Sequence, residues 1–268
     1  MITEIKIKME IQIKKTVKAG NSSAVILPRA WLNKEVRIEL IRKTSETILS
    51  ETIDILKKPM DIKDVIGIYL VGSYARKEED ENSDIDILVI TSDIDKEIIH
   101  EGIYNILIIS KELLKQKLEQ DLFPIGQMIK EAEPLLNSDY IKSINVNVTK
   151  RNVKWYLDTT EDKLKIIRKI LDKFLDNNEN PVDNKVVYTL VLRIRTFYII
   201  DKLIKGKNYS KKDFIKLIEK ISNGKNAYNG YLAIKNDLNK KNLASLEEVE
   251  RLYNYLKDEL IRIKKIIG

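Results

Sequence analysis

The sequence predicts an α+β fold in three parts, and three patterns along the chain support this prediction. Residues 4–41 alternate apolar and polar side chains in short segments broken by Gly, Asn and Pro, as strands and hairpins do. Between residue 61 and about residue 120, apolar strand segments alternate with helical ones, which is typical of an α/β domain. From about residue 150 onward, apolar residues recur at helical spacing. We therefore expect a β module over 1–43, an α/β domain over 45–148 and a helical bundle over 150–268.

The N-terminal module is expected to consist of short strands. Residues 4–15 alternate strictly and would form its first strand. A turn at residues 20–22, Gly-Asn-Ser, separates two further segments, so we expect a hairpin there. The apolar segment 24–28 ends at a proline, and a last strand is expected over 36–40.

The α/β domain is expected to open with a helix over 45–58, because its isoleucines and leucine lie near helical spacing and Pro59 follows. The segments after it alternate in type. We expect strands over 66–71, 84–91 and 104–110, and helical segments over 73–80 and 111–120.

The C-terminal part is expected to form a bundle of five helices. Its clearest helix covers 183–205, where apolar residues form one stripe and Gly206 fits a C-terminal cap. Pro181 separates this helix from an earlier one over 153–176. Two Ser-x-x-acid capping boxes open later helices, Ser210 with Asp213 and Ser245 with Glu248.

Composition excludes several classes of protein. None of the apolar runs in these 268 residues approaches the ~20 residues that a membrane span needs, so we expect no membrane association. The first residues alternate without a continuous apolar core and do not resemble a signal peptide, which favours a cytoplasmic location. The absence of cysteine excludes disulfide scaffolds and thiolate metal sites. The single histidine, His100, excludes a poly-histidine metal site, and the Lys/Ile/Glu bias suits a thermophilic source.

The positive charge is concentrated at the N-terminus. Residues 1–43 carry ten basic and four acidic side chains, a net charge of +6, whereas the other 225 residues carry 38 basic and 37 acidic side chains, a net charge of +1. A short basic module attached to a nearly neutral remainder of the chain is expected if the module binds a polyanion. The alternative is a solvated basic surface with no partner.

The residues that indicate chemistry follow two apolar strands. The first strand ends at Gly72 and Ser73, and the second carries Asp84 and Asp86, which point to the same face because strand residues alternate. Two adjacent carboxylates repel each other unless a cation lies between them, and Mg²⁺ favours such oxygen ligands together with substrate phosphates. Gly72 allows close approach of the backbone to a phosphate, and Ser73 offers hydrogen-bond donors to it. This arrangement indicates nucleotidyl transfer.

At these four residues the sequence resembles the nucleotidyltransferase fold of the DNA polymerase beta superfamily, and in particular its minimal nucleotidyltransferases, whose motif is Gly-Ser-x10-Asp-x-Asp. The resemblance covers about residues 45–120. It implies a mixed sheet with helices on one side, Mg²⁺ bound by Asp84 and Asp86, and an NTP, with ATP expected, as substrate. Catalysis is then assigned to Asp84, Asp86 and Ser73, and nucleotide binding to Gly72, Ser73 and Arg76.

Two positions depart from that family pattern. Lys77 stands where family members often have glycine. The third carboxylate, which the next strand usually supplies, is replaced at its candidate position by Asn105, an amide that cannot accept a proton at neutral pH. Glu101 lies nearby and could substitute, whereas His100 is expected to be an exposed loop residue.

The basic module resembles AbrB-like swapped-hairpin DNA-binding domains over roughly residues 10–43. The shared pattern is a basic strand, a Gly-Asn-Ser turn, a short apolar strand and a proline, followed by another strand. The resemblance implies an interleaved homodimer, because about 40 residues cannot bury an adequate core alone. It also implies four contacts to nucleic-acid phosphates, Lys14, Lys15, Lys18 and Arg29.

Two functions of different classes therefore stand open. The first is a Mg²⁺-dependent nucleotidyltransferase that moves NMP from ATP to a hydroxyl of a protein, an RNA or a small molecule. Minimal nucleotidyltransferases often act as antitoxins on a partner protein, so a toxin–antitoxin role is one form of this hypothesis. The second is a DNA-binding transcriptional regulator whose nucleotidyltransferase fold senses nucleotide or is inactive; a structural assembly factor is a third option.

Overall fold

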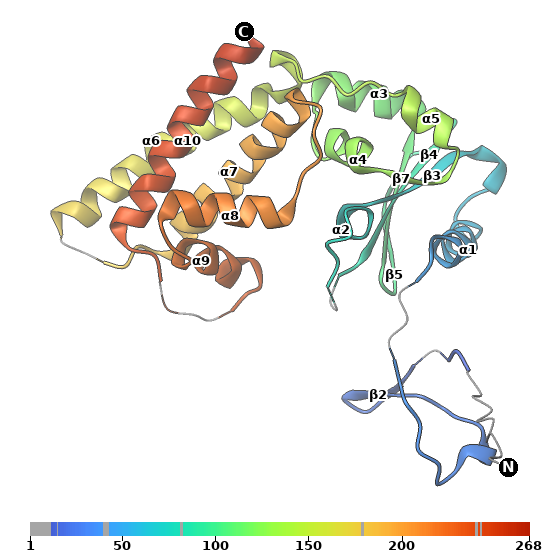
Figure 1. Cartoon of the computed structure of the whole chain (residues 1–268). Helices are drawn as coiled ribbons and strands as arrows, with labels where there is room; N and C mark the ends of the chain where they lie inside the picture. The colour runs from blue at the N-terminus through green and yellow to red at the C-terminus, as the bar shows by residue number, and fades with distance from the viewer. Residues whose placement is uncertain are drawn as a thin grey trace, which may run out of the picture. The chain divides into compact units, whose positions relative to one another are not determined.

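The computed structural model describes residues 12–14, 16–39, 43–80, 83–177, 180–238, 241 and 243–268. The chain forms two compact units, Met1–Lys43 and Thr44–Gly268. The second unit contains both the sheet and the C-terminal helices (Figure 1). The domain boundary expected near residue 149, inside this unit, stays a prediction.

In the N-terminal unit, the expected hairpin is present between β1 (Val17–Ala19) and β2 (Ser22–Ala24), which pair antiparallel around Gly20. Gly20 has φ +61°, a left-handed conformation that glycine adopts without strain. The strands expected over 24–28 and 36–40 are wrong over their described residues beyond Ala24, which hold no regular strand. A 3-10 turn, Arg29–Trp31, follows Pro28 instead. The strand expected over 4–15 lies mostly outside the described residues, as does Lys15.

The body is built on a five-stranded mixed sheet with the order β5-β6-β4-β3-β7. Its strands are β3 (Val65–Val71), β4 (Ile85–Thr91), β5 (Lys96–Glu101), β6 (Tyr104–Ser110) and β7 (Glu133–Leu136). The two central neighbours β4 and β6 are parallel, and every other pair is antiparallel. The expectation of a mixed sheet is therefore confirmed.

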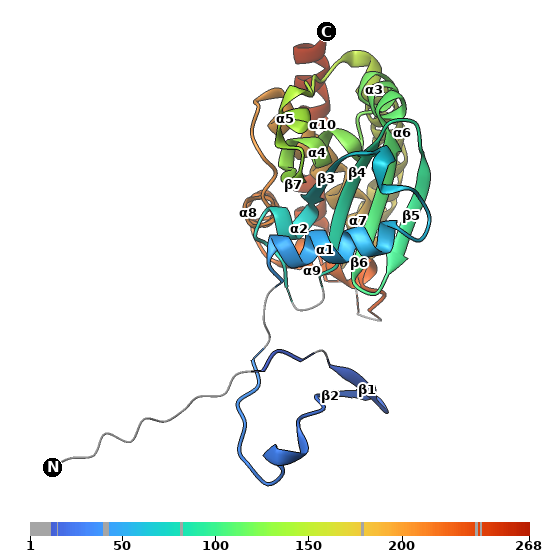
Figure 2. The same cartoon turned by 90° about the vertical axis from the view of Figure 1, so that its right-hand side faces the viewer.

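Helices cover both faces of this sheet, so the expectation of helices on one side is wrong. Side chains of one face, among them Ile68, Ile85 and Ile87, pack against α1 (Ser45–Leu56), which lies in front of the sheet in Figure 2. Those of the other face pack against α3 (Lys111–Gln120), α4 (Ile125–Glu131) and α5 (Ser138–Ser143). Both faces of the central strands are apolar, and each face needs a covering layer.

Several elements of the body were not anticipated from the sequence. They are β5, β7, α4 and α5, all of them short. Strand β5 matters most for function, because it places His100 on a strand rather than in the expected loop. His100 is exposed, as expected.

Over its described residues the C-terminal part of the body contains five helices (Figure 1), namely α6 (Lys150–Asp176), α7 (Asn184–Ile204), α8 (Lys211–Ser222), α9 (Asn226–Lys235) and α10 (Leu246–Ile267). They surround one apolar core. Ser245 and Glu248 form the expected reciprocal capping box, whereas the side chain of Ser210 accepts one hydrogen bond, from the Asp213 N–H. No helix among the described residues is long and apolar enough to cross a membrane.

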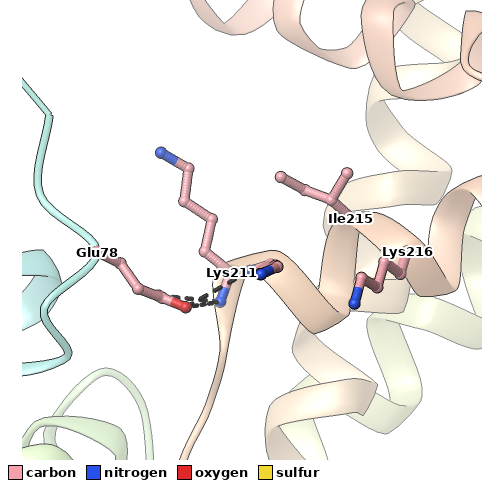
Figure 3. Close-up of a pocket in the computed structure, with 5 residues that line it drawn as sticks. Glu78, Lys211, Ile215 and Lys216 are labelled. Atoms are coloured by element: carbon pink, nitrogen blue, oxygen red, sulfur yellow. Dashed lines mark hydrogen bonds between the residues drawn. The ribbon is translucent and has the colours of Figure 1, made fainter.

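The loop after the first central strand is tied to the helices by Glu78. Its carboxylate accepts hydrogen bonds from the backbone N–H of Lys211 at 2.8 and 3.0 Å, at the start of α8 (Figure 3). Arg76 donates to the same carboxylate at 3.1 Å. Burial raises the pKa of Glu78, but these hydrogen bonds outweigh it and the pKa is lowered. The ionised form of Glu78 therefore stabilises the contact between this loop and the start of α8.

We expect Glu78→Gln to lower the free energy of unfolding at pH 7 by about 1–2 kcal/mol, because hydrogen bonds to a charged group are replaced by weaker neutral ones. A carboxyl group whose pKa is lowered by folding stabilises the protein at pH values above its ordinary pKa, and this stabilisation is lost as the pH falls. The difference in unfolding free energy between wild type and Glu78→Gln should therefore shrink below about pH 4.5. Urea unfolding at several pH values measures this. Glu119→Gln, at an exposed position on α3, is the matched control and should change little.

Candidate active site

The pairing of the central strands brings the sequence motif together at one end of the sheet. Asp86 pairs with Val71, the last residue of β3, and Asp84 immediately precedes β4. Ile85 and Ile87 are fully buried on the opposite face, as expected. The two carboxylates therefore share one face and lie next to the Gly72–Ala75 turn, α2.

Gly72 lies against the carboxylate of Asp86. A Cβ placed on Gly72 would lie 2.2 Å from Asp86 Oδ2, and the residue has φ +71°. Both facts restrict this position to glycine. Ser73 follows on the same turn, and its hydroxyl has no hydrogen-bond partner among the described residues. The motif glycine thus allows the end of β3 to approach the aspartates closely.

Asn105 completes the group, since the register of the parallel pair places it directly beside Asp86. Its amide nitrogen donates to Asp86 Oδ1 at 3.2 Å and to Asp84 Oδ2 at 3.3 Å. Its oxygen lies 2.7 Å from His100 Nδ1, and His100 pairs with Asn105 across β5 and β6. Four side chains from the strands and the loop before β4 thus form one hydrogen-bonded row.

Glu101 cannot stand in for the missing carboxylate. It follows His100 on β5 and so points to the opposite face of the sheet. There its carboxylate pairs with Lys58, just beyond α1. Asn105, and not Glu101, occupies the position next to the aspartates.

A buried acid also holds the motif turn, one that sequence reasoning missed. Glu131 at the end of α4 accepts from the Gly72 N–H at 2.9 Å and from Arg76 Nη1 at 2.7 Å. Its side chain is only 4% exposed. Arg76, a candidate nucleotide ligand, is thereby engaged by Glu131 and Glu78. The Gly72 N–H is likewise occupied, because it donates to Glu131. Of the two motif residues Gly72 and Ser73, only Ser73 therefore has a side-chain donor available for a ligand. No sequence signal marks Glu131, because it lies 45 residues after Asp86 in an unanticipated helix.

The site fits a divalent cation. Burial raises the pKa of Asp86 above its ordinary value, the hydrogen bond from Asn105 opposes this rise and the negative charge of Asp84 adds to it. A cation between the carboxylates would relieve both unfavourable effects. Among the described residues no group of three or more acidic or histidine side chains gathers for a metal, so this site offers its two aspartates alone. Two carboxylates suffice for Mg²⁺ that also binds substrate phosphates.

A cationic group from the helices lies near this turn. The ring of Tyr209 has the guanidinium carbons of Arg76 and Arg195 each 5.2 Å from its centroid. Arg195 Nε is buried without a hydrogen-bond partner among the described residues. Burial lowers the pKa of Lys235, the charges of Arg195 and Lys211 lower it further, and the charge of Asp80 opposes this decrease. Positive charge therefore outweighs negative charge around Lys235.

The proposed nucleic-acid contacts lie in the other unit. Lys14, Lys18 and Arg29 are exposed. Lys15 lies outside the described residues. Their role stays a prediction.

Residues 49–176 match the family model described as a nucleotidyltransferase domain. This span contains the sheet, the aspartates and α6. The chain is therefore a transferase, and the reaction that this domain supports is the transfer of a nucleoside monophosphate. No curated protein matches the chain.

Two solved structures are similar to most of the chain. One is a nucleotidyltransferase-like protein from Exiguobacterium sibiricum 255-15, 16% identical, with a TM-score of 0.36 over 81% of this chain and 73% of that one. The other is the spectinomycin adenyltransferase from Enterococcus faecialis with ATP and spectinomycin, also 16% identical with a TM-score of 0.36, over 79% of this chain and 99% of that one.

We expect Gly72→Ala to destabilise the protein and to disrupt the site, because the new Cβ would meet the Asp86 carboxylate. Gly102→Ala is a matched control: Gly102 has φ +62° but no heavy atom within 4 Å of a built Cβ. Each variant should lose about 1–2 kcal/mol from the left-handed backbone. Gly72→Ala should lose at least about 1 kcal/mol more from the collision. Equal unfolding free energies for the two variants would contradict the close contact.

Proposed function

We propose that this protein transfers a nucleoside monophosphate from a Mg²⁺-bound NTP, with ATP as the expected donor, to a hydroxyl group. One observation carries the proposal: Asp84 and Asp86 share one face, and Asp86 is in direct contact with Gly72 at the start of the motif turn. The family match over residues 49–176 supports nucleotidyl transfer in general. The metal, the donor base and the acceptor go beyond that match.

In this proposal Asp84 and Asp86 hold the metal ion and the Ser73 hydroxyl donates to a phosphate oxygen of the nucleotide. A bound Mg²⁺ would polarise the α-phosphate and lower the charge barrier to attack. Glu131 fixes the turn that carries Ser73, since it binds the Gly72 N–H and Arg76 together. These residues would hold the donor phosphates in a fixed orientation, so that they are already positioned when the acceptor hydroxyl binds.

The distal phosphates of the nucleotide are assigned to the helical part. Arg195 lies over the ring of Tyr209, which also contacts Arg76, three residues beyond Ser73. Lys235 lies close enough to Arg195 for their charges to interact. Neither has a carboxylate within ion-pair distance among the described residues. Burial first, and then the charges of Arg195 and Lys211, lower the pKa of Lys235. An anionic polyphosphate would neutralise this group.

Proton removal from the acceptor is the weak step of the proposed reaction. Asn105 stands beside Asp86 and cannot accept a proton at neutral pH. We therefore expect slow turnover unless the acceptor supplies its own base. The acceptor is a protein, an RNA or a small molecule, and an antitoxin that modifies a partner toxin is the form of the proposal that names a protein acceptor.

The N-terminal unit is proposed to dimerise the protein. None of its described residues is buried, and large apolar side chains lie open to solvent, among them Ile13, Ile26, Leu32 and Ile38. Such a short segment cannot form an adequate core alone. A second copy of the same segment would cover these side chains, in agreement with the AbrB-like pattern.

The second candidate function is a DNA-binding regulator that senses nucleotide or has lost transfer activity. The net charge of +6 on residues 1–43 favours it, as does Asn105 at the position of a base. In this case Lys14, Lys15, Lys18 and Arg29 would contact phosphates, and affinity would fall with salt.

We expect wild-type protein to bind a non-hydrolysable ATP analogue only with Mg²⁺, and Asp84→Asn/Asp86→Asn to lose this binding, because the variant lacks the charged ligands. Isothermal titration calorimetry measures both without knowledge of the acceptor. The control is Asp139→Asn/Asp258→Asn, which removes the same charge from exposed positions outside the site. Absence of binding by the wild type would exclude the enzyme proposal.

A gel shift with double-stranded DNA separates the second candidate from the first. We expect Lys14→Glu/Lys18→Glu to abolish any shift, and Lys220→Glu/Lys257→Glu, the same charge change on the helices, to leave it intact. The shift should weaken steeply as salt rises. A shift that both variants retain would exclude the N-terminal unit as the DNA-binding surface.

Light scattering of the wild-type protein tests the proposed dimer.

A further inference from the structure

The amide of Asn105 faces the two aspartates with its nitrogen. Ionised carboxylates only accept hydrogen bonds, so the donors at 3.2 and 3.3 Å from Asp86 and Asp84 must be the amide hydrogens. The amide oxygen is therefore turned toward His100, and the ring nitrogen at 2.7 Å must carry the hydrogen. The hydrogen-bonded row thus has one direction, from His100 through Asn105 to the aspartates.

This direction determines which carboxylate oxygens are open. Asp86 Oδ1 and Asp84 Oδ2 accept from Asn105. Asp86 Oδ2 faces the other way and lies against Gly72, where it would be 2.2 Å from a Cβ. The Asp86 oxygen that Asn105 does not bind therefore lies beside Gly72. On the opposite side, a cation would meet the positive end of the amide.

We infer that the site holds a single divalent cation, bound through the aspartate oxygens that Asn105 does not contact, and that His100 is the positioning residue that keeps Asn105 as a hydrogen-bond donor to both aspartates. This inference rests on the proposed function. A second cation beside Asn105 would need an oxygen ligand there, and the amide presents hydrogens instead. Asn105 thus orients the metal ligands from outside the coordination shell, a role whose loss typically costs 10–100-fold in metal affinity.

His100 is suited to this role by its place on β5. Strand pairing sets it directly opposite Asn105, and its contact with Asn105 is the one side-chain hydrogen bond it makes within the described part of the chain. Without the ring N–H, the amide could turn its oxygen inward. An asparagine at position 100 would restore an N–H close to the position of Nδ1.

The experiment counts Mn²⁺ ions by electron paramagnetic resonance on the full chain with one equivalent of a non-hydrolysable ATP analogue. We expect one bound Mn²⁺ per chain in the wild type and two in Asn105→Asp, which adds a carboxylate on the closed side. We expect His100→Ala to weaken Mn²⁺ binding at least about tenfold and His100→Asn to keep it within about threefold. Circular dichroism verifies that each variant is folded.

The outcomes separate this inference from the proposed function. Two Mn²⁺ ions per wild-type chain would overturn the single-cation inference while leaving nucleotidyl transfer in place. Equal affinity in wild type and His100→Ala would overturn the role of His100. Absence of any protein-bound Mn²⁺ with the analogue would remove the proposed function itself. If Asn105→Asp does not fold, the Mn²⁺ count of the wild type still tests the single cation, and the two His100 variants still test the role of His100.

Discussion

The close contact between Gly72 and Asp86 is the constraint on which the rest of the site depends. Strand β3 ends where β4 begins, so the turn after β3 meets the aspartates at the distance set by strand pairing. No side chain fits between them. Glu131 then holds the turn by its first N–H, so the position of Ser73 relative to the carboxylates follows from contacts within the protein.

The same turn joins the sheet to the helices through a short series of charges. Glu131 and Glu78 both bind Arg76, and Glu78 in turn caps the first turn of α8. An arginine between two acids is strongly held, because each hydrogen bond is charge-assisted. The helical part therefore supports the turn directly, in addition to any contact that it makes with a substrate.

The sequence predicted the placement of the motif residues better than it predicted the elements around them, for physical reasons. Gly72, Ser73, Asp84 and Asp86 follow two apolar strands, and strand alternation was enough to place the aspartates on one face. Glu131 and His100 escaped prediction because α4 and β5 are short and carry weak periodicity, and only the three-dimensional register brings them to the motif. The strands expected over 24–28 and 36–40 failed for a different reason: beyond Ala24, none of their described residues is buried against a partner that would order them.

His100 is the only imidazole in the protein, and it touches the residue next to the aspartates. Its ring protons consequently give an isolated pair of signals in a proton NMR spectrum, free of overlap from other histidines and without isotope labelling. The chain thus contains a built-in spectroscopic reporter, whose chemical shifts follow events at the aspartates through a single intervening amide.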